Sequence, residues 1–139
     1  MAISGKVRAT GARATAGPTG QAEIVSATGA KITLSSALST PGYSPVDLLY
    51  ASVAGCLVLS VRIAASEKHL LEKLREARAE VTGRKAPEAP PRITHFDIAM
   101  TVDGDFDEAT KHALIERAEE LCTVSNTVKQ SPEFVVTRR

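Results

Sequence analysis

The two cysteines are the residues of this sequence best suited to chemistry. Cys56 lies in the stretch AGCLVLS, inside a long apolar run with no charged residue beside it. If that run is helical, its face also carries the residues three, four and seven positions away: Leu49, Ser52, Val53, Leu59, Ser60 and Ile63. A thiol in such surroundings is either a small hydrophobic core residue or a nucleophile kept in a dry pocket.

Helical geometry also bears on which groups could help Cys56 to ionise. The thiol is about three turns into the run, too deep for the helix dipole to lower its pKa much. Asp47 is nine residues before Cys56, which at roughly 100° per residue places it about half a rotation away around the helix. Its carboxylate should therefore point away from the thiol, and a role as a helix cap is the simpler interpretation. The hydroxyls of Ser52 and Ser60 could hydrogen-bond a thiolate, although the simpler interpretation is that neither serine has more than a place in the helix.

Cys122 follows the last turn of a second amphipathic stretch. Leu114, Ala118 and Leu121 share one helical stripe with it, so this thiol also faces inward. Two buried thiols that the fold brings together can form a disulfide if their Cα atoms come within about 4.4–6.8 Å. The residues alone leave both possibilities open, an inert pair or a reactive one.

Composition limits the classes of function. With 17 Lys and Arg against 16 Asp and Glu, the formal net charge is +1, which gives no bulk field to attract nucleic acid or an anionic membrane. The three histidines are scattered and none has ligand spacing to a cysteine, so we expect no metal and no other cofactor. Two widely separated cysteines indicate a reducing compartment, and MAISGKVRAT lacks the layout of a secretory signal. We therefore expect a cytoplasmic protein.

The elements that must position the thiols follow from periodicity and turn residues. The chain is long enough for a single domain over 1–139. Residues 1–40 combine short β-compatible pieces with glycine turns, which predicts an N-terminal β-meander. A central helix is expected over 44–69, with Ser44 as N-cap and Asp47 answering it in a capping box. Because this helix is apolar on nearly all sides, we expect it to be buried rather than to span a membrane.

The second half of the chain predicts strands and one more helix. The stretch LLEKLREARAEVTGRK fits either a helix or a strand, whereas RITHFDIAMTVDGD alternates as a half-buried strand does. A helix is expected over 105–122, capped by Asp105 with Glu108 three residues on, and a final strand over 132–138. This order of elements predicts an α+β fold.

Two longer stretches resemble a known family. SPVDLLYASVAGCLVLSVRIAA and PPRITHFDIAMTVDGDFDEATKHALIERAEELCTVSNTV are similar to the OsmC/Ohr family of osmotically inducible and organic-hydroperoxide-resistance proteins. The resemblance implies a curved antiparallel sheet wrapped around the long central helix, two strands over 74–102, and an intertwined homodimer that covers the apolar helix. It also implies reduction of organic hydroperoxides: Cys56 is the peroxidatic residue, Cys122 resolves it to a disulfide, and an external dithiol reduces the disulfide.

The resemblance is incomplete at the group that activates the thiol. In peroxidase members, a glutamate just after the proline at the start of the helix holds an arginine of the N-terminal sheet near the reactive cysteine. This chain has Val46 at the position of that glutamate, and the nearest acidic residue is the next one, Asp47. No arginine occurs between Arg13 and Arg62, so Arg13 is a candidate partner only if the first strand delivers it. Burial without a nearby cation raises the pKa of a thiol. We therefore expect Cys56 to react with peroxide more slowly at neutral pH than the reactive cysteine of those members does.

Three functions therefore stay open at this stage. The first is thiol-dependent reduction of organic hydroperoxides. The second is a redox or sulfur-handling reaction of the same cysteine pair on another electrophile. The third is non-catalytic binding of small apolar molecules between helix and sheet.

Overall fold

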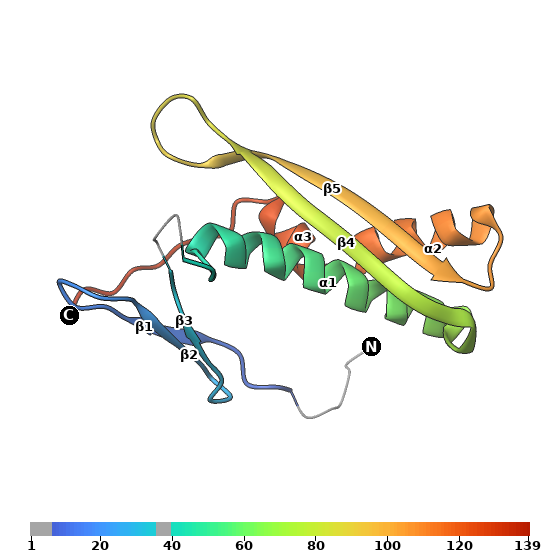
Figure 1. Ribbon diagram of the computed structural model, residues 1–139, viewed down its shortest axis with the longest axis horizontal. Helices are drawn as coiled ribbons and strands as arrows, with labels where there is room; N and C mark the ends of the chain where they lie inside the picture. The colour runs from blue at the N-terminus through green and yellow to red at the C-terminus, as the bar shows by residue number, and fades with distance from the viewer. Residues whose placement is uncertain (1–6, 36–39) are drawn as a thin grey trace. The chain divides into compact units, whose positions relative to one another are not determined.

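The structure is a computed structural model, and it describes residues 7–35 and 40–139. Within these residues the elements are β1 (Ala12–Thr15), β2 (Glu23–Ser26), β3 (Lys31–Thr33), α1 (Pro45–Glu67), the short 3-10 helix η1 (Leu71–Lys73), β4 (Leu74–Lys85), β5 (Ile93–Gly104), α2 (Glu108–Leu121) and α3 (Thr123–Val128) (Figure 1). The chain forms two compact units, Met1–Leu48 and Leu49–Arg139, and the single domain expected over 1–139 stays a prediction.

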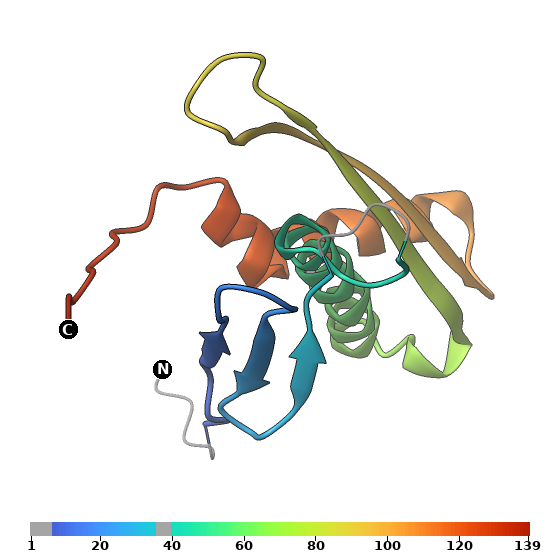
Figure 2. The same ribbon diagram turned by 60° about the vertical axis from the view of Figure 1, so that its left-hand side comes forward.

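The N-terminal unit contains a three-stranded antiparallel meander in the order β1-β2-β3 (Figure 2). Gly29, with φ of +96°, lies in the turn between β2 and β3 and takes a conformation that suits glycine. The predicted β-meander is therefore present within residues 12–33; the part of the prediction that falls on 1–6 and 36–39 lies outside the described residues.

The start of α1 is fixed by the capping box that the sequence predicted. The amide of Asp47 donates to Ser44 Oγ at 3.1 Å, and the amide of Ser44 donates to Asp47 Oδ2 at 3.0 Å. The helix ends at Glu67, two residues earlier than predicted, because His69 adopts a left-handed φ of 56° and the Leu70 amide closes the turn on Ala65 at 2.8 Å.

In the C-terminal unit, α1 packs against a long antiparallel hairpin and the two later helices. β4 pairs with β5 from Leu74 opposite Gly104 to Lys85 opposite Ile93. Both views place this hairpin along α1, and its connecting loop extends beyond the helices (Figures 1 and 2). The ambiguous stretch after residue 73 is thus a strand, because its apolar residues pair with those of β5 and pack on α1.

Two groups of buried side chains hold this unit together. One joins Val61, Ala64 and Ala65 of α1 to Val102 of β5 and to Leu114 and Ala118 of α2. The other joins Val53 and Leu57 of α1 to Cys122. Gly83 of β4 makes room for Tyr50, because a Cβ added at Gly83 would lie 2.5 Å from the Tyr50 hydroxyl. The rings of Tyr50 and Phe96 pack edge to face, with their centroids 5.9 Å apart.

Burial of α1 is one-sided within the described residues, and the cover expected from a second chain stays a prediction. Val53, Leu57 and Val61 are buried, whereas Leu59 and Ile63 are 53% and 51% exposed. By length and a mean hydropathy of 1.9, α1 is the one helix of the described residues that could cross a membrane, yet its buried face packs on a sheet and on α2 as a core helix does.

Two predicted boundaries were wrong. The cap of α2 is Asp107, whose Oδ1 accepts from the Thr110 amide at 2.8 Å; Asp105 instead donates its own amide to Lys73 O at 3.0 Å, so the helix starts later. The strand expected over 132–138 is not formed. Phe134, Val135 and Val136 are strongly exposed, and a strand needs a neighbouring edge that this segment does not meet within the described residues.

Candidate functional site

The structure brings the two cysteines into one apolar cluster. Cys122 is completely buried, with Val53 and Leu57, and Cys56 packs against this group. The remaining surroundings come from both strands and α3: Ala79, Val81, Phe96, Met100 and Val124. Both cysteines are free thiols. Two residues far apart along the chain thus form a pair whose immediate neighbours are apolar.

Cys56 lies on α1 at the border between the buried and the exposed face. On one side are the buried Val53 and Ser60, and on the other the exposed Ser52 and Leu59. The thiol itself is half-buried. Of the pair it is therefore the one that a small molecule from solvent can reach.

Cys122 links the two last helices and is held by their backbone. It is the residue after Leu121 of α2 and the N-cap of α3, where its Sγ accepts a hydrogen bond from the Ser125 amide at 3.4 Å. Neither α3 nor this bond was predicted from the sequence. The signal was weak, because strong N-caps are Ser, Thr, Asp and Asn, and cysteine is not among them.

The surroundings shift the two thiols in opposite directions. Burial raises the pKa of Cys56, and the neighbouring Cys122 raises it further, against hydrogen bonds from the Val124 backbone and the Ser60 hydroxyl that lower it. Burial also opposes a charge on Cys122, but hydrogen bonds from Ser125, from the Cys56 thiol and from the Val124 backbone outweigh it, so the pKa of Cys122 is lowered. The negative charge of the pair is thus favoured on Cys122.

The supporting residues proposed from sequence separate into two groups. Ser60 is 3% exposed and its hydroxyl acts to lower the pKa of Cys56, while its part in the chemistry stays a prediction. Ser52 donates its hydroxyl to Leu49 O at 2.8 Å and is exposed, so it serves the helix rather than the thiol. Asp47 is engaged in the cap of α1, where the Ser44 amide and hydroxyl lower its pKa.

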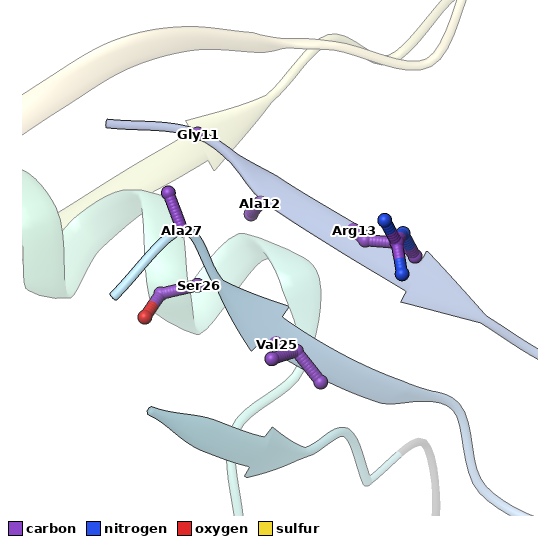
Figure 3. Close-up of a pocket in the computed structure, with 6 residues that line it drawn as sticks. All are labelled: Gly11, Ala12, Arg13, Val25, Ser26 and Ala27. Atoms are coloured by element: carbon purple, nitrogen blue, oxygen red, sulfur yellow. The ribbon is translucent and has the colours of Figure 1, made fainter. Parts of the chain in front are cut away.

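Arg13 belongs to the N-terminal unit, on β1 opposite Val25 of β2 (Figure 3). It lines a surface hollow together with Gly11, Ala12, Val25, Ser26 and Ala27. The side chain is exposed and carries the only charge among these lining residues. Its role as a partner of the Cys56 thiolate stays a prediction.

A small cavity of about 70 Å³ lies beside the thiol pair. Its lining comes from α1, β5 and α3 and consists of Val53, Phe96, Ile98, Ser125, Val128 and Lys129. Val53 and Phe96 are also part of the cluster around Cys122. The Ser125 hydroxyl is buried and has no partner of good hydrogen-bond geometry within residues 7–35 and 40–139. The cavity is therefore lined mostly by apolar side chains, with Ser125 and Lys129 as its two polar residues.

The described residues include no group of three or more His, Cys, Asp or Glu side chains placed to hold a metal ion. The chemistry that this arrangement offers is that of the thiols themselves: a half-buried sulfur that meets an incoming electrophile, and a buried sulfur next to it that can close a disulfide.

Comparison with known proteins agrees with this geometry. The model of the family described as OsmC-like protein matches residues 36–137. The chain belongs to the OsmC-like protein family. No match was found among curated protein sequences.

Solved structures of the OsmC-like family share the fold at low sequence identity. An OsmC-like protein from Mycoplasma pneumoniae is 16% identical with a TM-score of 0.75, and the match covers 88% of both chains. An organic hydroperoxide resistance protein OsmC from Legionella pneumophila is 20% identical with a TM-score of 0.71, covering 90% of this chain and 92% of that one. The organic hydroperoxide resistance protein OhrB of Bacillus subtilis is 20% identical with a TM-score of 0.66, covering 86% and 90%.

These likenesses establish a mixed α+β fold with antiparallel sheets and a central helix. This confirms the α+β class expected from the sequence, whereas the wrapping of the sheet around the helix and the intertwined homodimer stay predictions. The family match confirms the resemblance.

Proposed function

We propose that this protein reduces organic hydroperoxides with Cys56 as the attacking thiol and Cys122 as the resolving thiol. The observation that carries the proposal is the packing of half-buried Cys56 against fully buried Cys122 in one apolar cluster. Membership in the OsmC-like family, with neighbours named organic hydroperoxide resistance proteins, agrees with it.

The reaction takes two chemical steps on the protein. The Cys56 thiolate attacks the distal oxygen of the hydroperoxide, the O–O bond breaks, and the alkoxide leaves and takes up a proton to become an alcohol. Cys56 is then a sulfenic acid. The Cys122 thiolate attacks this sulfur, hydroxide leaves, and a disulfide forms, which an external dithiol reduces to restore both thiols.

The apolar surroundings favour an organic hydroperoxide over hydrogen peroxide. The cavity that adjoins the cluster around the thiols is lined by the apolar Val53, Phe96, Ile98 and Val128 together with the polar Ser125 and Lys129. An alkyl group that fills such a space leaves water and gains free energy of about 25 cal/mol per Å² of apolar surface, which hydrogen peroxide cannot do.

A homodimer is the second part of the proposal. Leu59 and Ile63 form an exposed apolar stripe on α1, and Phe134, Val135 and Val136 are exposed in the C-terminal segment. A second copy of the chain that covers the stripe would remove it from water and close the surroundings of Cys56.

The test of the reaction is consumption of cumene hydroperoxide with dithiothreitol as the reductant. The wild-type protein is expected to turn over and Cys56→Ser to be inactive. In a single turnover without dithiothreitol, Cys122→Ser is expected to stop at a sulfenic acid that dimedone traps. A folded wild-type protein that consumes no hydroperoxide and keeps both thiols would overturn the proposal. If it instead exchanges readily with another disulfide, the alternative redox function applies.

A further inference from the structure

The cavity that adjoins the thiol cluster has an apolar interior of limited size. Its lining residues are Val53, Phe96, Ile98, Ser125, Val128 and Lys129, and the surface that they turn toward it is apolar. The volume of about 70 Å³ leaves room for about five to seven groups the size of a water molecule. Apolar cavities stay dry and take up apolar molecules of matching size. The interior therefore suits a short alkyl chain or a single aromatic ring.

Exposure divides the lining of this cavity into a floor and a rim. Val53 and Ser125 are buried and form the floor, whereas Ile98 and Val128 are 43% and 37% exposed and form the rim. Lys129 is exposed as well and belongs to the rim. A ligand that enters from solvent thus passes the rim first and reaches the buried floor with its far end.

Lys129 is the charged residue of this lining. Because the surface that faces the cavity is apolar, the residue contributes carbon atoms to the wall rather than its ammonium group. A lysine in such a place packs its methylene stem on the apolar surface and keeps the ammonium group in water. Within residues 7–35 and 40–139, Lys129 forms no ion pair with a carboxylate of the chain. The rim therefore offers a positive charge that a ligand can pair.

We propose that this cavity binds a small anionic amphiphile: the apolar part of the ligand fills the interior, and Lys129 pairs with its carboxylate at the rim. The inference rests on the proposed function and names a substrate class for it, the hydroperoxides of small aliphatic or aromatic carboxylic acids. Lys129 is then the residue that distinguishes anionic from neutral hydroperoxides.

The floor of the cavity is continuous with the surroundings of the thiols. Val53 and Phe96 line the cavity and also pack in the cluster that contains Cys122 and contacts Cys56. Ser125 lines the cavity too, and its amide donates to Cys122 Sγ at 3.4 Å. A ligand held by its carboxylate at the rim therefore extends its other end toward the cluster that holds the sulfurs.

The size of the cavity favours a free acid over a lipid in a membrane. A lipid also combines an anionic group with apolar chains, but those chains are longer than a space for about five to seven water-sized groups. We therefore commit to the free acid. Binding of the protein to phosphatidylglycerol vesicles without binding of hexanoate would assign the cavity to a lipid surface and overturn the proposal.

A chain-length series tests whether the cavity takes up the alkyl group. The reduced, full-length protein is titrated with butanoate, pentanoate, hexanoate and octanoate, and the amide signals of Ser125, Val128 and Lys129 are followed by NMR. We expect the affinity to rise about fourfold for each methylene up to about six carbons and to level off beyond that length, where the interior is full. Affinity that is the same for all four acids would overturn the proposal.

Variants at Lys129 test the pairing with the carboxylate. Lys129→Met keeps an apolar stem without the charge, and we expect it to bind hexanoate about fivefold more weakly and 1-hexanol unchanged. Lys129→Arg keeps the charge and should retain the binding of hexanoate. Lys68→Met, at an exposed lysine after the end of α1 and outside this lining, is the matched control and should bind both ligands as the wild type does. Equal affinity for hexanoate in wild type and Lys129→Met would overturn the pairing.

A matched pair of substrates connects the site to the reaction. Cumene hydroperoxide and its derivative with a carboxylate in the para position differ by one charge. We expect the wild type to have a kcat/KM about fivefold higher for the carboxylate, and Lys129→Met to lose this preference while Lys68→Met keeps it. If hexanoate binds as described but neither hydroperoxide is consumed, the proposed function fails and the binding site stands. If both hydroperoxides are consumed with the same ratio in wild type and Lys129→Met, the proposed function stands and the role of Lys129 fails.

Discussion

Cys56 on α1 packs against Cys122 at the junction of α2 and α3, so two thiols from distant segments share one apolar cluster. One of them is within reach of solvent and the other is completely buried. In the proposed reaction, Cys56 is therefore the thiol that meets the oxidant and Cys122 the thiol that captures the oxidised sulfur.

Ser60 and Ser52 form a matched pair for the activation of Cys56. Ser60→Ala removes a hydroxyl that favours the thiolate, so the pKa of Cys56 is expected to rise and alkylation at neutral pH to slow by about two- to tenfold. Ser52→Ala removes only a bond to Leu49 O and should leave the rate unchanged. The pH dependence of iodoacetamide alkylation measures both. Equal rates in the two variants would contradict the role of Ser60.

The capping box at the start of α1 is expected to act on stability rather than on chemistry. Ser44→Ala removes the hydroxyl that accepts the Asp47 amide and should lower the free energy of unfolding by about 1 kcal/mol, measured by urea denaturation. The first-step rate of Cys56 should not change. A large loss of rate without loss of stability would assign the cap a catalytic part.

Acid should weaken the same cap. The Ser44 amide holds the pKa of Asp47 below its ordinary value of 3.8, so this carboxylate stabilises the folded state above pH 3.8 and loses that effect as the pH falls through its folded pKa. Asp47→Asn should flatten this part of the pH profile of stability. An unchanged profile in the variant would show that other carboxylates determine it.

The cavity beside the thiols should select the organic group of the substrate. Val128→Phe places a larger side chain in a space of about 70 Å³ and is expected to raise KM for cumene hydroperoxide about tenfold. Val128 is itself more than a third exposed, so the fold should tolerate the change. The rate with hydrogen peroxide, which needs no apolar space, serves as the control. An equal loss with both peroxides would contradict selection by this cavity.

The exposed stripe of α1 should form the interface of a dimer. Leu59→Glu places a charge where an apolar side chain is 53% exposed, and analytical ultracentrifugation is expected to show a shift from dimer to monomer. Leu71→Glu, at an exposed leucine outside α1, is the control and should leave the assembly unchanged. A wild-type protein that sediments as a monomer would remove the proposed interface.

Sequence patterns predicted the elements with strong local signals. The box of Ser44 and Asp47 located the start of α1, and the alternation of Phe96, Met100 and Val102 located β5. The stripe of Leu114 and Ala118 located the buried face of α2. In each case a local hydrogen bond or a periodic burial pattern determines the structure, and both can be recognised in the sequence.

What the sequence did not predict depends on contacts between distant residues. The pattern of residues 74–85 fits a helix or a strand, and only the family resemblance favoured the strand, which forms because β5 supplies a partner edge. Residues 132–138 have the pattern of a strand but meet no partner edge within the described residues. The same holds for the site. Both cysteines were identified, but the capping of α3 by Cys122 and the lowering of its pKa depend on the Ser125 amide and on Cys56, which come together only in the fold.

The most direct measurement is a thiol count with mass-spectrometric mapping after the reduced, full-length protein meets one equivalent of cumene hydroperoxide. Our account predicts the loss of both thiols, a single disulfide between Cys56 and Cys122, and recovery of both thiols with dithiothreitol. A folded protein whose two cysteines remain unmodified under a large excess of the hydroperoxide would contradict it.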